Sequence, residues 1–137
     1  GVTGGVTEAV LRRLSTDHTK ETMREIAECG VRGDEGIKEF SVSYKDMEIK
    51  VCVASGLANA RKVMEQVKNG EAQYHPIEIM ACRRGYIMGG GRPVRAGART
   101  KAARAKGLYN ADNTMLIKKS DENPMVLELH EGLLKGK

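Results

Sequence analysis

Residues 78–93 read Glu-Ile-Met-Ala-Cys-Arg-Arg-Gly-Tyr-Ile-Met-Gly-Gly-Gly-Arg-Pro. The apolar run 77–81 predicts a short buried strand that ends at Cys82. Four glycines follow, Gly85 and Gly89 to Gly91, and they allow tight turns or the close approach of another group. A helical pattern rich in Ala, Arg and Lys comes after the loop. A strand, a glycine-rich loop and a helix together form a frame for a bound inorganic or anionic group.

Residues 40–53 carry the clearest local pattern in the chain, with apolar side chains at every second position on both sides of a turn at Lys45-Asp46. This alternation predicts a β-hairpin with one buried face. Cys52 points away from the face of Val51 and Val53. We therefore expect Cys52 to be a half-buried structural thiol rather than a ligand.

Helical spacing of apolar residues predicts five helices. They cover 6–16, about 19–27, Leu57 to a C-cap at Asn69-Gly70, about 96–109, and a last helix that Asn123 caps and Pro124 begins. We expect a buried apolar stripe on the first helix (Val6, Val10, Leu11 and Leu14), Met64 in the core, and a loop over 110–114. The order predicts an α+β (α/β-like) fold, in which the hairpin and one further strand form a mixed sheet flanked by helices.

The entry to the first helix leaves two interpretations open. Gly4-Gly5 directs free backbone N–H groups toward whatever lies beside them, which suits an anion or a cluster. A glycine helix entry without a ligand fits the sequence equally well.

Composition limits the class of protein. A chain of 137 residues, 40% apolar and 30% charged, suits one domain or part of a larger one. It contains no apolar run long enough for a membrane span and no secretory signal. Three cysteines form no close pair, which favours reduced thiols and a cytoplasmic location. Because the chain begins without Met, we expect a fragment or a processed chain.

The loop and the helix after it are basic. Eight Arg or Lys residues and no Asp or Glu lie between Arg83 and Lys106. The residue types leave three hypotheses: a phosphate cradle, which lacks the usual glycine motifs; a nucleic-acid surface, which lacks interleaved aromatics; and a soft metal bound through Cys82 with partners from elsewhere. A solvated charged face is the plainest alternative.

The motif narrows these hypotheses. Met80-x-Cys82-x-x-Gly85-Tyr86-x-x-Gly89-Gly90-Gly91-Arg92-Pro93 resembles the third signature of the iron-only (FeFe) hydrogenases, M-x-C-x-x-G-C-x-x-G-G-G-Q-P. Stretches 1–9, 31–39 and 56–61 resemble further parts of that family. The stretches 95–110 and 120–124 look most like the catalytic subunit of NAD(P)-linked, electron-bifurcating or NADP-reducing types.

The resemblance implies the fold of the C-terminal half of the catalytic domain, with residues 1–137 forming a partial domain whose N-terminal half is missing. Its cofactor would be the H-cluster, a 4Fe-4S cubane joined to a two-iron centre. Cys82 would then ligate the cubane, Met80 would line the two-iron centre, and Gly89, Gly90 and Gly91 would lie against the cofactor. No catalytic acid or base is implied within the chain.

The implied partners are the missing half of the domain and an electron-transfer partner, either ferredoxin or NAD(P)H-linked subunits. No membrane partner is implied, and a nucleic-acid partner is disfavoured.

Two positions depart from the motif. Tyr86 stands where the family has the cysteine that bridges the two parts of the cluster, and a phenolic oxygen is a hard donor in place of a soft thiolate. Arg92 stands where the family has Gln and adds a fixed cation. We therefore expect a hydrogenase that is inactive or impaired. The alternatives are a non-catalytic iron-sulfur or partner-binding relative and, more remotely, a basic nucleic-acid-binding domain.

Overall fold

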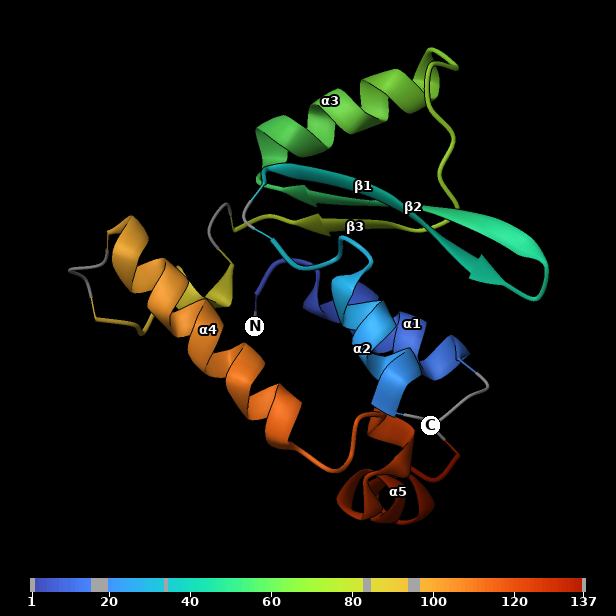
Figure 1. The fold of residues 1–137 in the computed structure, drawn as a ribbon, viewed down its shortest axis with the longest axis vertical. Coiled ribbons are helices and arrows are strands. Elements are labelled where there is room, and N and C mark those ends of the chain that lie inside the picture. The colour runs from blue at the N-terminus through green and yellow to red at the C-terminus, as the bar shows by residue number, and fades with distance from the viewer. Residues whose placement is uncertain (1, 16–19, 34, 83–84, 94–96, 137) are drawn as a thin grey trace.

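The computed structural model describes residues 2–15, 20–33, 35–82, 85–93 and 97–136. One mixed sheet lies between helix α3 on one face and helices α1 and α2 on the other, while α4 extends to one side and α5 lies beyond α1 and α2, away from the sheet (Figure 1). The elements are α1 (Gly5–Leu14), α2 (Lys20–Glu28), β1 (Ile37–Tyr44), β2 (Met47–Ser55), α3 (Leu57–Lys68), β3 (Ile77–Met80), the 3-10 turn η1 (Tyr86–Met88), α4 (Ala98–Thr114), η2 (Ser120–Glu122) and α5 (Pro124–Glu131).

The sheet has the predicted composition. Strands β1 and β2 are antiparallel, and their turn places Lys45 and Asp46 at φ values of 47° and 64°, a left-handed pair that suits the twist of a hairpin. Strand β3 pairs parallel to β2, with Cys52 opposite Ile77 and Ser55 opposite Met80. Helix α3 makes the crossover between the two parallel strands. The prediction of an α+β fold with a mixed sheet is confirmed.

The central strand β2 is buried on both faces near its end, which corrects the expected one-faced hairpin. Cys52 and Ala54 pack with Val63 of α3, and all three side chains are fully buried. Val51 and Val53 alternate with them and are also fully buried. Cys52 is therefore wholly rather than half buried, because α3 covers the face that the alternation assigned to solvent. Burial raises the pKa of its thiol to about 11.

Three other burial expectations were wrong. Helix α1 buries Thr7, Glu8, Leu11 and Arg12, whereas Val6 is 66% exposed and Val10 is 47% exposed. Met64 is 50% exposed, and the residues that α3 buries are Ala60 and Val63. Strand β3 is an edge strand whose side chains are only partly covered, and its Ile79 is 46% exposed.

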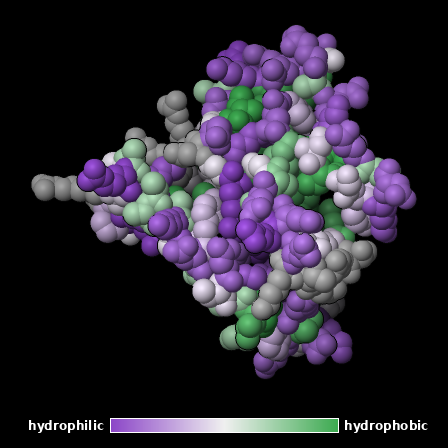
Figure 2. Space-filling view, viewed as in Figure 1, coloured by the Kyte–Doolittle hydropathy of each residue, from purple (hydrophilic) through white to green (hydrophobic). Residues whose placement is uncertain are grey.

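Helix α4 is longer than predicted and ends at Thr114, so 110–114 is helical rather than a loop. The expected start at 96 lies outside the described residues. The cap of α5 is confirmed, since the Asn123 side chain accepts a hydrogen bond from the Met125 N–H and Pro124 begins the helix. Neither α4 nor α5 buries a single described residue. Figure 2 shows apolar groups at the surface of the end formed by α5.

No helix in the described part of the chain combines the length and the apolar character that crossing a membrane requires.

Candidate metal centre

The candidate ligand Cys82 lies just past the end of β3, where the strand leaves the sheet. The Gly56 N–H donates to the Met80 carbonyl at 2.7 Å, which holds the last residue of the strand against the start of α3. The next turn closes through a 3.0 Å bond from the Gly85 N–H to the Cys82 carbonyl. The Cys82 side chain is exposed and forms no disulfide. A thiol in this position is accessible to a metal that other groups help to hold.

Glu78, two residues before Met80, joins β3 to the start of α1. One carboxylate oxygen accepts from the Gly4 N–H at 2.9 Å, and the other accepts from the Thr7 N–H at 2.8 Å and from the Thr7 hydroxyl at 2.6 Å. The anion beside Gly4-Gly5 is therefore supplied by the chain itself, where it satisfies free N–H groups and interacts favourably with the helix dipole. Sequence reasoning missed Glu78, because its partners lie about seventy residues away.

Met80 is held in the same corner. The Thr3 hydroxyl lies 3.5 Å from the Met80 sulfur and donates to it. Glu78 and Met80 point to the same face of β3 since they are two residues apart in a strand. The structure thus brings the N-terminal Thr-Gly-Gly segment against the strand that carries the candidate ligands.

The N-terminal segment is held in place by the close approach of Gly4 to Val31 and by hydrogen bonds from Lys38. Gly4 has a φ of 95°, and a Cβ at this position would lie 2.4 Å from the Val31 carbonyl oxygen, so no other residue fits. The Lys38 ammonium donates to the carbonyls of Thr3 at 2.8 Å and Val31 at 2.6 Å. Burial lowers the pKa of Lys38, and the nearby Glu78 carboxylate opposes that shift.

Gly90 and Gly91 of the loop, unlike Gly4, have free space around them. Gly85 and Gly91 have φ values of 67° and 76°, which favour glycine. A Cβ at Gly90 or Gly91 would meet nothing within 4 Å in the described part of the chain, and one at Gly89 would make only ordinary contacts. Among these residues, nothing packed against Gly90 explains a glycine there.

Tyr86 begins η1 with its side chain 66% exposed, while the next residue, Ile87, is buried. Arg104 of α4 supports the turn from behind, donating to the Ile87 carbonyl at 2.7 Å and approaching the Met88 sulfur at 3.7 Å. The loop therefore presents the Tyr86 ring outward and anchors its other side. Of the remaining basic residues in this stretch, Arg83, Arg84 and Arg95 lie outside the described residues.

The donor set fits an iron–sulfur group in part. Cys82 is a soft, accessible donor of the kind that such clusters use, whereas Tyr86 offers a hard oxygen. No group of three or more His, Cys, Asp or Glu side chains is arranged to hold a metal within the described ranges. Any cluster bound through Cys82 needs further ligands from outside them.

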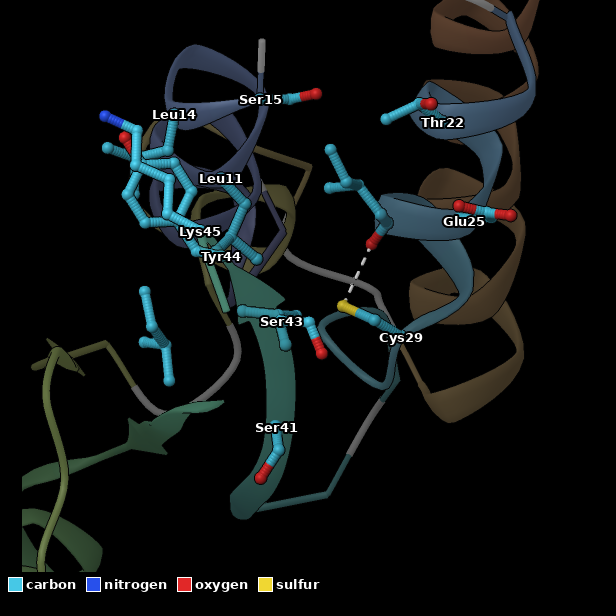
Figure 3. Close-up of a pocket in the computed structure, with 13 residues that line it drawn as sticks. Leu11, Leu14, Ser15, Thr22, Glu25, Cys29, Ser41, Ser43, Tyr44 and Lys45 are labelled. Carbon is cyan, nitrogen blue, oxygen red and sulfur yellow. Dashed lines mark hydrogen bonds between the residues drawn. The ribbon is translucent and has the colours of Figure 1, made fainter. Parts of the chain in front are cut away.

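A separate cavity of about 410 Å³ lies between α1, α2 and the hairpin. Figure 3 shows Leu11, Leu14, Tyr44 and Cys29 around it, with the Cys29 thiol donating to the Ile26 carbonyl at 3.0 Å. Burial raises the pKa of the Cys29 thiol, which makes the reactive thiolate form less available. None of the lining residues belongs to 78–93, and the cavity takes no part in the candidate centre.

Two family models match the chain. Residues 1–90 match the C-terminal domain of the iron-only hydrogenase large subunit, and residues 98–137 match the iron hydrogenase small subunit.

Several curated proteins are similar to the chain. The subunit HndD of the NADP-reducing hydrogenase of Solidesulfovibrio fructosivorans is 42% identical over 98% of this chain and 23% of its own length. Iron hydrogenase 1 of Clostridium pasteurianum is 36% identical over 96% of this chain and 24% of its own length. A cytosolic Fe-S cluster assembly factor of Xenopus tropicalis is 31% identical over 62% of this chain and 18% of its own length. The chain thus spans about a quarter of the length of the hydrogenases it matches.

Solved structures of FeFe hydrogenases are also similar to the chain. An FeFe hydrogenase of Chlamydomonas reinhardtii superposes with a TM-score of 0.65 at 29% identity, covering 98% of this chain and 41% of that one. A structure that describes stepwise assembly of the H-cluster in an FeFe hydrogenase gives a TM-score of 0.64 at 29% identity and covers 98% of this chain and 42% of the other.

Proposed function

Because the chain belongs to the iron-only hydrogenase family, we propose that it forms part of a catalytic domain for the reversible reduction of protons to hydrogen at an H-cluster. The observation that carries the proposal is the accessible Cys82 thiol at the end of β3, with Met80 held beside it through Thr3. In this proposal the rest of the domain supplies the other ligands.

Each residue of the motif takes a role that suits its chemistry. Cys82 ligates the 4Fe-4S cubane, and Met80 presents a soft, polarisable side chain to the two-iron centre. Gly89, Gly90 and Gly91 let the backbone lie close to the cofactor, in agreement with the open space around Gly90. When bound, the cluster supplies the redox chemistry. Glu78 and Lys38 would keep the N-terminal segment in place beside the strand that leads to Cys82.

Tyr86 and Arg92 are the two residues that make this site less suited to an H-cluster than the family motif. A phenol does not replace a bridging thiolate, and the guanidinium of Arg92 adds a positive charge that cannot be removed. We propose that a protein with Tyr86 does not assemble a normal H-cluster and is inactive or impaired.

The partners follow from the surface of the chain and from its relatives. The remaining part of the domain would cover the exposed Val6 and Val10 on α1. The electron-transfer partner would be ferredoxin or NAD(P)H-linked subunits, and the similarity to the NADP-reducing HndD subunit supports the second option. Free thiols suit the reducing cytoplasm.

The deciding experiment restores the thiolate. We expect Tyr86→Cys in the full-length protein to raise the iron content and to produce hydrogen evolution with a reduced electron donor. The matched control Tyr86→Phe keeps the ring, removes the oxygen, and should change neither quantity. Hydrogen evolution by the unmodified protein as fast as by the Tyr86→Cys variant, or an iron content that Tyr86→Cys leaves unchanged, would contradict the proposal. Loss of the cubane signal in Cys82→Ser would support the ligand assignment.

A second candidate is a non-catalytic iron-sulfur or partner-binding relative. Tyr86 favours it, because the cubane position keeps its thiol while the bridge does not. The similarity to the Xenopus tropicalis Fe-S cluster assembly factor supports the same candidate. This function predicts that Tyr86→Cys leaves hydrogen evolution absent while the unmodified protein still binds a cubane.

A further inference from the structure

Arg104 of α4 holds the turn that carries Tyr86. The Arg104 Nη1 atom donates to the Ile87 carbonyl at 2.7 Å and lies 3.7 Å from the Met88 sulfur. The two backbone hydrogen bonds that close η1 are longer, at 3.2 Å each. The bond from Arg104 comes from outside the turn, so it fixes where the turn lies relative to α4.

Glycines on both sides of η1 leave its position to contacts such as this one. Gly85 precedes the turn at a φ of 67°, and Gly89 follows it in an extended conformation. Because glycine restrains the backbone weakly, the flanking segments do little to orient η1. Ile87, which is buried, and the bond from Arg104 to its carbonyl orient the turn instead. Tyr86 is the neighbour of Ile87 in the chain and moves with it.

One face of α4 connects this turn to a distant part of the fold. Arg104, Ala105, Tyr109 and Asp112 are half-buried and recur every three or four positions, which places them on the same side of the helix. Arg104 and Asp112 are eight residues apart, or about 12 Å along the helix axis. The end of α4 at Arg104 therefore depends on what holds the end at Asp112.

The end at Asp112 is held by a buried cluster of charges. Arg12 donates to both Asp112 oxygens at 2.8 Å, and the Arg32 Nη2 atom lies 2.7 Å from Asp112 Oδ2. Glu8 accepts from both arginines. The side chains of Arg12 and Glu8 are only 10% and 9% exposed, so water screens these interactions poorly. The Tyr109 ring adds a cation–π contact, 4.4 Å from the Arg32 guanidinium carbon.

We propose that Arg104 is a positioning residue for residue 86, and that α4 is a strut between this residue and the anchor at Asp112. The inference rests on the proposed function, in which residue 86 occupies the bridging position of the H-cluster. A helix of two turns is stiff, so the charge cluster at one end sets the position of Arg104 at the other. The turn is thereby ordered before the cofactor binds, which lowers the cost of binding it.

Hydrogen exchange in the full-length protein without its cofactor tests the contact. Arg104→Met keeps the apolar stem and removes the donors, so the Gly89 amide that closes η1 should exchange at least about fivefold faster. Arg99→Met is the matched control, because Arg99 is exposed on the same helix. It should change this rate by less than about 1.5-fold. An unchanged rate in Arg104→Met would overturn the positioning role.

A substitution at the other end tests the strut. Asp112→Asn should speed exchange at the Gly89 amide at least about twofold, although Asp112 lies two helical turns from the contact. Asp121→Asn is the control, since Asp121 pairs at 2.9 Å with Arg13, whose side chain is exposed. It should leave the rate unchanged. An Asp112→Asn protein with the Gly89 rate of the unmodified protein would overturn the strut.

Iron content separates this inference from the proposed function. Adding Arg104→Met to the Tyr86→Cys protein should reduce the gain in iron at least about threefold, whereas Arg99→Met should preserve the gain. A gain that Arg104→Met leaves intact would overturn the role of Arg104 at the cofactor. If Tyr86→Cys produces no gain at all, the proposed function fails, while faster exchange at Gly89 in Arg104→Met still supports the positioning of residue 86.

Discussion

The sheet face under α3 and the inner side of α4 both join parts of the chain that are distant in sequence, but opposite kinds of side chain build them. Cys52, Ala54 and Val63 meet under α3 without any charge. At α4, Arg12, Arg32 and Asp112 meet, and no residue of the helix is buried. The first interface depends on the exclusion of water from apolar side chains and contains no ion pair among its described residues. The second depends on charge balance, so conditions can weaken it while the sheet stays folded.

The largest expected effect lies in the apolar interface. Val63→Asp buries an unpaired carboxylate and should lower the free energy of unfolding by more than about 4 kcal/mol, enough to prevent folding. Met64→Asp, one residue along the same helix but 50% exposed, should cost less than about 1 kcal/mol. Urea unfolding followed by circular dichroism measures both. Equal losses would mean that the contrast between the two faces of α3 is wrong.

The second largest effect is expected in the charged interface between α1 and α4. Glu8→Gln removes one carboxylate from a buried cluster and should lower the free energy of unfolding by about 3 kcal/mol. Glu65→Gln is the matched control, since Glu65 pairs with Arg61 at 2.8 Å on the exposed side of α3. It should change the free energy by less than about 0.5 kcal/mol. A neutral result for Glu8→Gln would show that the cluster contributes nothing to stability.

Acid should weaken the same interface. Hydrogen bonds from Arg12, with help from Arg32, lower the pKa of Asp112 from 3.8 to about 2. Because the pKa of Asp112 is lower in the folded than in the unfolded protein, ionised Asp112 stabilises the folded state at any pH above its ordinary pKa. This contribution, on the order of 2 kcal/mol, is lost as pH falls from about 4 to about 2. The difference in unfolding free energy between the unmodified protein and Asp112→Asn should therefore shrink over this range. A difference that is constant with pH would exclude the titration of Asp112 as its source.

The smallest effect concerns the corner of the candidate metal centre. Glu78→Gln keeps the shape of the side chain but places an amide NH₂ against the N-terminus of α1, at a cost of about 1 kcal/mol. Faster hydrogen exchange at the Thr7 amide would locate the effect at the helix start. Glu48→Gln, on an exposed strand position, should alter neither quantity. Unchanged exchange at Thr7 would show that Glu78 does not hold this corner.

Local sequence patterns predicted the positions of helices, strands and caps better than they predicted which side chains are buried. The hairpin turn, the crossover helix and the Asn123 cap depend on neighbouring residues, and all were predicted correctly. The exposure of Met64 and the full burial of Cys52 depend on how α3 lies over the sheet, and these were missed. Helix α4 includes residues 110–114, where a loop was expected. Arg12 and Arg32 bind Asp112 in this stretch, and these long-range contacts override its weak helix propensity.

The sequence by itself determined the family and the α+β fold, since the ordered motifs and the periodicities are local properties of the chain. It also identified Cys82 and Met80 as candidates and Tyr86 as the departure. Only the tertiary structure showed that Glu78 supplies the anion at the start of α1 and that α4 is joined through a charge cluster. The reason is physical: the partners of Glu78 and Asp112 are seventy or more residues away, and folding alone brings them within hydrogen-bond distance.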